Sequence, residues 1–273
     1  MRYGITYQGS KNAIAEQIIG ALPAGKRLVD LFGGGFAISH CALLSGKWRT
    51  VIYNDINPLL PKLIWDAICG AYNPDRWTPA WVSMEQFNDQ KMTDGYVKYC
   101  WSYGCNGWDY LYSKEKEEGK HKLHDAYFRG EIKKIPRENR LIHMERIHSL
   151  QALEKLSSIV YHGGLGTLNI DYRDYEHEEG DVVYCDIPYQ NAIDPRVTKQ
   201  YGRKFDHGAF YAWAVSRPYP VYFSSYKLGG IVWEGDKRGT MNRKNDDIRR
   251  EVLYCVDNEF TPPGRYYQGH LFT

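Results

Sequence analysis

The residues with the clearest chemistry in this chain are Asp186, Ile187, Pro188 and Tyr189, which directly follow the apolar run Val182–Cys185. This run predicts a buried strand of the parallel type, so the motif falls at the strand's carboxyl end, where open α/β sheets bind ligands. The Asp186 carboxylate can accept one hydrogen of a planar aromatic amine and the Ile187 carbonyl the other, while Tyr189 offers a ring for stacking. Pro188 has a fixed φ and helps to hold that carbonyl in place. A strand that ends in a proline turn would give the same pattern.

A second group of candidate residues surrounds a glycine-rich turn near the amino terminus. Asp30 stands near the end of an apolar run, and Gly33, Gly34 and Gly35 follow it before an apolar, helix-like stretch. Consecutive glycines let a backbone pass close to a ligand and the helix start exposes N–H groups, although the pattern is not G-x-G-x-x-G. Asp55 ends the next apolar run about twenty residues further on, where nucleotide-binding α/β units place the carboxylate that binds a ribose. Asp55 is also suited to cap a helix, and the two roles are compatible.

Four segments, taken in this order, resemble the Dam-type adenine-N6 DNA methyltransferases of bacteria and their phages: Tyr7–Lys11, Asp30–Gly35, Asn54–Asn57 and Asp186–Tyr189. Ser102–Gly107 resembles part of that family's DNA-recognition region, and the likeness extends over most of the chain. The resemblance implies a site-specific enzyme that transfers a methyl group from S-adenosylmethionine to the N6 amino group of adenine. The implied partner is double-stranded DNA, from which the target base is flipped out.

The resemblance also implies roles for individual residues. The residues implied in catalysis are Asp186, Ile187, Pro188 and Tyr189. Those implied in cofactor binding are Tyr7, Lys11, Asp30, Phe32, Gly33, Gly34, Gly35, Asp55, Ile56, Asp171, Tyr172 and Asp186. Those implied in DNA binding are Tyr103, Asn106 and Trp108. Within this set, Asp30 is expected to meet the methionine amino group and Asp55 the ribose, and Asp171 and Tyr172 are the weaker matches.

Two positions depart from the family pattern. Ile187 stands where the family usually has proline, which removes a restriction on φ worth roughly 1 kcal/mol but keeps the carbonyl. Cys105 stands where the family often has an aromatic residue that helps to open the duplex. We expect Trp108 or Tyr103 to supply that ring instead.

The target explains why two hydrogen-bond acceptors suit this reaction. An adenine amino nitrogen is a poor nucleophile because its lone pair is delocalised into the ring. Acceptors that hold both N–H groups stabilise the positive charge that develops on nitrogen during attack, so they act mainly in the transition state. The methyl group of S-adenosylmethionine is already activated, and alignment is most of the remaining task. Asp186 is therefore expected to position and polarise the amine rather than to act as a strong general base.

Other functions remain compatible with the same residues. Any planar exocyclic amine fits the acceptor pair, so the substrate is alternatively an RNA adenine, the N4 amine of cytosine, or a glutamine side chain of a protein. A catalytically inactive DNA-binding homologue is a further alternative, for which Ile187 is the hint. The segment from Tyr103 to Gly107 favours DNA over protein.

Composition narrows the class of protein. The six cysteines occur singly, without a C-x-x-C pair or paired Cys/His spacing, so we expect neither a metal site nor a disulfide framework. The amino terminus has no apolar signal core and no run approaches about 18 apolar residues, so we expect a cytoplasmic protein without membrane spans. Net charge is only +2, but Lys and Arg outnumber acids by twelve to five between Arg196 and Arg250, and by nine to six between Lys114 and Arg140. Such stretches suit phosphate contacts. Oligomeric state, recognised sequence and a restriction-modification or phage role stay open.

The elements that position these residues alternate along the chain. The sequence predicts strands at 27–32, 50–55, 158–160, 182–185, 221–225 and 252–256, and helices at 12–21, 36–45, 58–69 and 137–156. Alternation stops between about 72 and 135, where clean strands are missing. We therefore predict an α/β protein with a Rossmann-like methyltransferase sheet and a mainly helical inserted domain. The predicted catalytic and cofactor-binding domain is 1–70 with 151–273, and the predicted target-recognition domain is 71–150.

Overall fold

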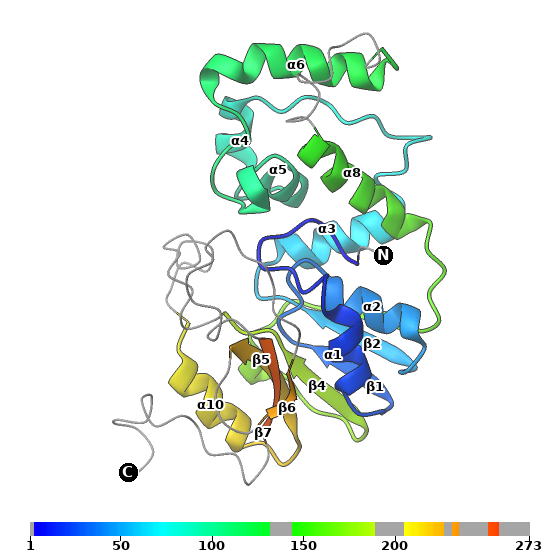
Figure 1. Ribbon diagram of the computed structural model, residues 1–273, viewed down its shortest axis with the longest axis vertical. Helices are drawn as coiled ribbons and strands as arrows, with labels where there is room; N and C mark the ends of the chain where they lie inside the picture. The colour runs from blue at the N-terminus through cyan, green and yellow to red at the C-terminus, as the bar shows by residue number, and fades with distance from the viewer. Residues whose placement is uncertain (1–2, 132–143, 189–204, 227–230, 235–250, 257–273) are drawn as a thin grey trace. The chain divides into compact units, whose positions relative to one another are not determined.

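The computed structural model describes residues 3–131, 144–188, 205–226, 231–234 and 251–256 (Figure 1). The chain divides into two compact units. The first, here called the helical unit, comprises Met1–Ser10, Gly34–Phe36 and Asn57–Val160. The second, here called the sheet unit, comprises Lys11–Gly33, Ala37–Ile56 and Tyr161–Thr273.

The sheet unit is built on a seven-stranded sheet in the order β3-β2-β1-β4-β5-β7-β6. Its strands are β1 (Arg27–Asp30), β2 (Thr50–Asn54), β3 (Gly164–Leu168), β4 (Asp181–Cys185), β5 (Val221–Tyr226), β6 (Ile231–Glu234) and β7 (Glu251–Val256). The strands from β3 to β5 are parallel, whereas β7 runs antiparallel to both β5 and β6. The parallel part has the order of a doubly wound sheet, so the predicted Rossmann-like fold is confirmed. Strand order reverses between β1 and β4, and this switch point is where such sheets bind ligands.

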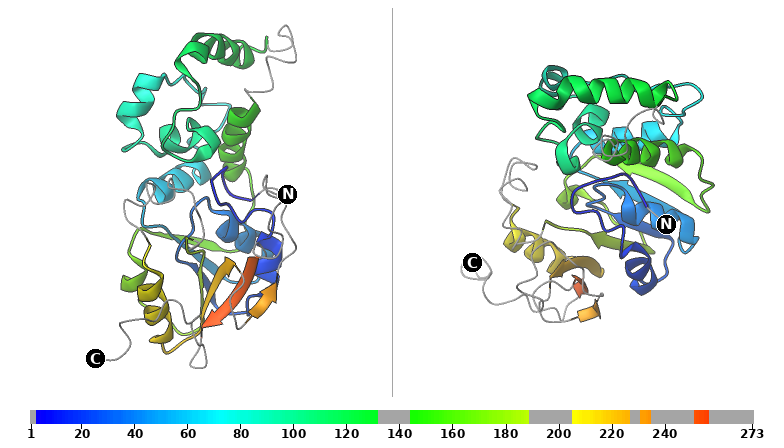
Figure 2. Two further views of the ribbon diagram at one scale, coloured as in Figure 1. Left: turned by 60° about the vertical axis from the view of Figure 1, so that its left-hand side comes forward. Right: turned by 45° about the horizontal axis from the view of Figure 1, so that its top comes forward.

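The central strands are apolar because both of their faces are covered. Leu28 and Val29 of β1 lie beside Val182 and Val183 of β4, and all four side chains are buried. Helices α1 (Ala15–Ala21) and α2 (Ala37–Ser45) lie on one face of the sheet and α10 (His207–Val215) on the other (Figure 2). The sequence therefore predicted the centre of the sheet from its apolar runs.

The edge strand was predicted at the wrong place. Residues 158–160 form a turn and an irregular segment in which Val160 is 83% exposed, and the strand is instead β3, Gly164–Leu168. Two of the five residues of β3 are glycines, so the segment has few of the β-branched residues that are typical of a strand. A Cβ at Gly166 would lie 2.8 Å from the Cδ1 atom of Ile52 on β2, so a side chain there would require this methyl group to shift. Pairing with β2 therefore defines this strand more than its own composition does.

The helical unit contains five α-helices in the described residues and one 3-10 turn: α3 (Leu59–Ile68), α4 (Met84–Gln90), α5 (Gly95–Cys100), η1 (Tyr103–Cys105), α6 (Lys114–Phe128) and α8 (Met144–Ser157). Local signals begin two of them: Ser83 forms a capping box with Gln86, and the Asp94 side chain accepts from the backbone of Val97. The first residues of the predicted helix 137–156 lie outside the described residues. No helix in the described ranges has the length and hydropathy of a membrane span.

Helix α3 belongs to the helical unit, although residues 1–70 were predicted to form one domain with the sheet. It contacts α5 and α8, and a Cβ at Gly95 would lie 2.6 Å from the Leu59 carbonyl oxygen. The absent side chain of Gly95 thus allows α5 to approach α3 closely. This contact joins a helix next to the sheet segments in sequence to the inserted helices.

Candidate active site

Three carboxylates stand where neighbouring parallel strands end. Asp30 is the last residue of β1, Asp55 directly follows β2, and Asp186 directly follows β4. Parallel neighbours end at the same edge of a sheet, so the three acids gather at the switch point. The pKa of Asp30 is raised to about 7, chiefly by burial and also by the negative charges of Asp186 and Asp55, while the hydrogen bond from Ser39 opposes the rise. The structure thus brings together three of the acids that the sequence singled out.

Only one of the two carboxylate oxygens of Asp30 has a hydrogen-bond partner in the described residues. Its carboxylate is 1% exposed, and the Ser39 Oγ atom on α2 donates to Oδ2 over 2.7 Å. The other oxygen, Oδ1, is buried and has no hydrogen-bond partner in the described residues. A buried acceptor without a partner costs about 1–3 kcal/mol, so this oxygen suits a donor supplied by a ligand, above all a cationic one.

Asp186 is held by two side chains from different elements. The Lys11 Nζ atom lies 2.7 Å from Oδ1, with the Lys11 side chain 7% and the Asp186 side chain 20% exposed. The Ser224 Oγ atom on β5 donates to the same oxygen over 3.3 Å. Lys11 was expected to bind the cofactor, and the structure places it against the candidate catalytic carboxylate. Ser224 was not among the predicted site residues.

Two other residues of the candidate catalytic motif are held by packing and by one hydrogen bond. Ile187 is buried in the core that also contains Phe210 of α10. The Pro188 carbonyl oxygen lies 2.6 Å from the Nε2 atom of His207, the first residue of α10. These contacts restrict the loop at Ile187, the position where the Dam-type family pattern has a proline. Tyr189 lies outside the described residues.

Asn54 connects the loops around the strand ends and was not among the predicted site residues. Its side-chain Nδ2 atom donates to the carbonyls of Leu31, over 2.9 Å, and Ile170, over 3.1 Å, and its Oδ1 accepts from the Ile170 backbone. The Asp55 carbonyl accepts a hydrogen bond from Asn169 over 2.7 Å. An asparagine at the end of an apolar run is the sequence signal that would have indicated this role.

The glycine turn is packed by aromatic side chains of the chain itself. In the sheet unit, a Cβ at Gly33 would lie 2.1 Å from the Tyr53 ring. In the helical unit, a Cβ at Gly35 would lie 2.4 Å from the Cβ atom of Tyr7, and Gly34 has a positive φ of 45°. These glycines are therefore required by packing and backbone conformation, whatever ligand approaches them.

Aromatic rings gather beside the end of β1. The ring of Phe32 lies 5.3 Å from that of Tyr172 and 5.7 Å from that of Phe205. Asp171 begins the turn η4 (Tyr172–Asp174) and pairs with Arg173 over 2.6 Å, a hydrogen bond that lowers the pKa of Asp171. Of the predicted cofactor residues, Phe32 and Tyr172 thus share one cluster, whereas Ile56 is exposed.

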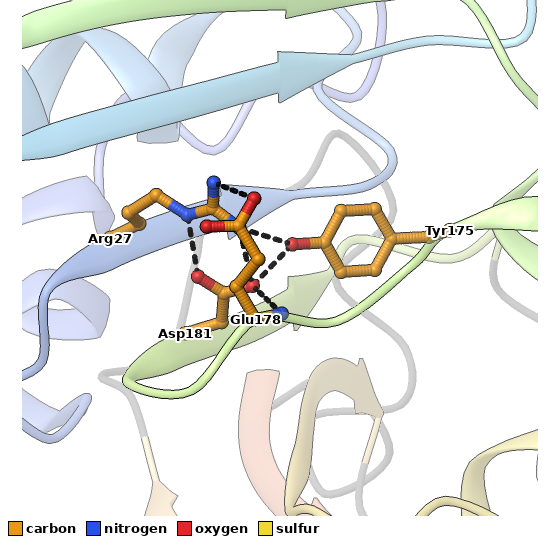
Figure 3. Close-up of polar contacts among 4 residues, drawn as sticks. All are labelled: Arg27, Tyr175, Glu178 and Asp181. Atoms are coloured by element: carbon orange, nitrogen blue, oxygen red, sulfur yellow. Dashed lines mark hydrogen bonds and ion pairs between the residues drawn. The ribbon is translucent and has the colours of Figure 1, made fainter.

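The amino ends of β1 and β4 are tied together by a polar network (Figure 3). The Arg27 Nε atom lies 2.6 Å from Asp181 Oδ1, and its Nη1 atom lies 2.6 Å from Glu178. Tyr175 donates to the same Asp181 carboxylate. Burial opposes ionisation of Asp181, but the hydrogen bonds from Arg27 and Tyr175 outweigh it and lower the pKa of Asp181. The network lies at the edge opposite the three acids, so its role is to hold the register of the two central strands.

The loop that was expected to bind DNA contains one exposed ring. Tyr103 is 58% exposed, while Asn106 is 2% exposed and builds the loop from within. The Asn106 Oδ1 atom accepts from the backbone of Trp108 and Asp109, and its Nδ2 donates to the Asp109 carboxylate. The half-buried Trp108 ring lies 4.8 Å from the Lys98 Nζ atom. Of the three predicted DNA-binding residues, Tyr103 is therefore the one placed to reach a partner directly.

The described residues contain no group of three or more His, Cys, Asp or Glu side chains arranged to hold a metal ion. The family model for D12 class N6 adenine-specific DNA methyltransferases matches residues 7–212. No curated protein matches the sequence. Among solved structures, the rRNA methyltransferase aviRa from Streptomyces viridochromogenes is similar at 12% identity, with a TM-score of 0.31, over 89% of this chain and 82% of its own.

Proposed function

Since this chain belongs to the D12 class N6 adenine-specific DNA methyltransferase family, it is an enzyme that methylates adenine in DNA at N6, and we propose that its methyl donor is S-adenosylmethionine. The observation that carries the proposal is Asp30, whose buried Oδ1 atom has no partner in the described residues. The ammonium group of a methionine moiety is a donor of the required charge and size. The roles of the predicted cofactor-binding and DNA-binding residues are part of the same proposal.

Within the sheet unit we assign three cofactor-binding roles. Asp30, held by Ser39, binds the ammonium group, and Asp55 binds the ribose hydroxyls. Phe32 and Tyr172 offer rings to the adenine of the cofactor. Besides Asp186, which we assign to catalysis, the remaining predicted cofactor residues are Lys11, Gly33, Ile56 and Asp171 of the sheet unit and Tyr7, Gly34 and Gly35 of the helical unit. When bound, S-adenosylmethionine supplies a methyl group on a positively charged sulfur.

Catalysis is assigned to the loop after β4. The Asp186 carboxylate accepts one amino hydrogen of the target adenine and the Ile187 carbonyl accepts the other, which stabilises positive charge on nitrogen in the transition state. Lys11 holds the carboxylate in place and His207 holds the adjoining Pro188 carbonyl. Adenine in a duplex cannot reach such acceptors, so we propose that it is flipped out and stacks on Tyr189.

Methyl transfer from labelled S-adenosylmethionine to duplex DNA, followed by nucleoside analysis, tests the proposal. The expected product is N6-methyladenine in DNA. Label in N4-methylcytosine, in RNA or in protein would identify one of the alternative substrates. Failure to label any of these at saturating cofactor would favour a DNA-binding homologue without activity.

The ribose role of Asp55 gives a first prediction. Asp55→Ala is expected to weaken S-adenosylmethionine binding by roughly 1–3 kcal/mol, because a hydroxyl pair loses its charged acceptor. Calorimetric titration measures the change. Glu179→Ala is the matched control, since it removes one exposed acid near the amino end of β4. Equal affinity of the folded Asp55→Ala variant and the control would remove Asp55 from the site.

The recognition loop gives a second prediction. We propose that Tyr103 fills the gap left by the flipped adenine and that Asn106 holds Trp108 and the rest of the loop in shape. Tyr103→Ala is then expected to slow methylation of a paired target by about 1–3 kcal/mol, the value of one stacking contact. A mismatched target costs less to flip, so it should restore most of the rate.

Tyr103→Phe keeps the ring and serves as the control, with an expected rate close to that of the wild type. Asn106→Ala is expected to relax or reduce methylation at cognate sites by about 1–3 kcal/mol, with little change in salt-dependent nonspecific binding. Sequencing of methylated sites measures both effects. Unchanged rate and site choice in Tyr103→Ala, Asn106→Ala and Trp108→Ala would move recognition to the basic stretch after Arg196.

A further inference from the structure

Asp186 is connected through Ser224 to a second hydroxyl group, deeper in the sheet. The Tyr184 hydroxyl oxygen lies 2.6 Å from Ser224 Oγ, which in turn lies 3.3 Å from Asp186 Oδ1. The Tyr184 and Ser224 side chains are at most 1% exposed. Both hydroxyl groups must therefore satisfy their hydrogen bonds inside the protein, where an unmade bond is expensive.

The register of the sheet explains how the three side chains meet. Tyr184 pairs with Tyr222 and Cys185 with Phe223, so the next positions along the two parallel strands are Asp186 and Ser224. Side chains two residues apart in a strand lie on one face, which puts Tyr184 and Asp186 on the same side. Ser224 lies level with Asp186 on the neighbouring strand β5, and its hydroxyl group contacts both side chains.

The chemistry of the groups fixes the direction of the chain. An ionised carboxylate only accepts hydrogen bonds, so Ser224 must donate to Asp186. The single hydroxyl hydrogen of Ser224 is then used, and Tyr184 must donate to Ser224. Each hydrogen bond therefore orients the next, from the buried Tyr184 hydroxyl group to the Asp186 carboxylate that follows β4.

We propose that Ser224 is a positioning residue for methyl transfer, which fixes the orientation of the Asp186 carboxylate, and that Tyr184 acts through Ser224. The inference rests on the proposed catalytic role of Asp186. Lys11 binds the same oxygen through its positive charge, whereas the hydroxyl groups of Ser224 and Tyr184 fix the orientation of the Asp186 carboxylate. An acceptor that must meet an amine in one geometry depends on both.

Steady-state kinetics with S-adenosylmethionine and duplex DNA tests this assignment. Ser224→Ala is expected to lower kcat about tenfold while KM for both substrates changes less than about twofold, because the orientation matters in the transition state. Ser224→Thr keeps a hydroxyl and should recover most of kcat. Ser225→Ala, the next residue on β5, is the matched control and should retain wild-type kcat.

A double-mutant cycle distinguishes positioning from a purely structural role. If Tyr184 acts through Ser224, Tyr184→Phe lowers kcat in the wild type, by about threefold, and has no further effect in Ser224→Ala. Losses that multiply in the double variant, or a kcat of Ser224→Ala within twofold of wild type, would overturn the proposal. If Ser224→Ala fails to fold, the test is the kcat of Tyr184→Phe, measured alone and in combination with Ser224→Thr. An unchanged kcat in Tyr184→Phe would overturn the proposal. A wild-type enzyme that makes no N6-methyladenine would instead contradict the proposed function.

Discussion

Replacing Asp186 with alanine is expected to lower kcat for methyl transfer by about 100- to 1,000-fold, the loss typical of one acceptor or donor that acts on transition-state charge. Affinity for cofactor and DNA should remain nearly intact, because the contact matters most after charge has begun to develop on the amino nitrogen. Single-turnover rates with preformed complexes measure this loss without contributions from binding.

The Lys11 contact calls for a second variant. Asp186→Ala leaves the nearly buried Lys11 ammonium without this ion pair, which destabilises the loop in addition to removing the acceptor. Asp186→Asn keeps the shape and one acceptor oxygen but removes the charge, so it should retain the fold and still lose most of the rate. Turnover above about a tenth of wild type in both variants, a loss of only ~1.4 kcal/mol, would contradict the assignment.

The positions of the three acids were predictable because the signal is local. Asp30, Asp55 and Asp186 each end or follow an apolar run, and alternation of runs with helical segments predicts parallel strands. Parallel neighbours present their carboxyl ends at one edge, so the sequence predicts the gathering of the acids as well as the strands. The edge strand was misplaced because β3 depends on pairing with β2 and has no apolar pattern of its own.

The groups that hold these acids could not be predicted in the same way. Ser39 and Ser224 contact Asp30 and Asp186 from other elements, and only the packing of α2 and the register of β5 bring them there. Serine is common at exposed positions, so its type alone gives no signal. Long-range partners follow from the fold and not from the local sequence.

Asn106 and the glycine turn show a second limit. An asparagine offers the same donors and acceptors to a base edge and to its own loop, and only burial tells which of the two it serves. Likewise, Gly33 and Gly35 make room for a ligand or for a neighbouring ring by the same absence of a side chain. The structure places the rings of Tyr53 and Tyr7 in that room.

Asp30 carries the other large prediction. Asp30→Asn is expected to weaken S-adenosylmethionine binding by about 2–5 kcal/mol, because it removes one charge of a buried, hydrogen-bonded pair. Ser39→Ala should weaken binding less, since the carboxylate charge remains and only its orientation is lost. Calorimetric titration measures both. Equal losses in the two variants would show that orientation, and not charge, dominates at this site.

The raised pKa of Asp30 leads to a prediction of how the stability of the ligand-free protein depends on pH. Burial raises the pKa of Asp30 from 3.8 to about 7, so the folded state binds more protons than the unfolded state between these values. Stability from this group is therefore fully present below about pH 4 and is lost as pH rises to about 7, by up to about 4 kcal/mol at 1.36 kcal/mol per pKa unit. Denaturant unfolding at pH 5 and pH 8 should show this decline in wild type and not in Asp30→Asn.

In the ligand-free protein, burial favours the protonated form of Asp30. Binding of an ammonium group reverses this, because the positive charge favours the ionised carboxylate. Binding near pH 6.5 must then release a proton from Asp30, and affinity must rise as pH increases through 7. Titrations in two buffers with different ionisation enthalpies measure the protons released. The difference between wild type and Asp30→Asn removes any proton that the ligand itself exchanges. A wild-type enzyme that releases no more protons than the variant would mean that Asp30 does not meet the cofactor's ammonium group.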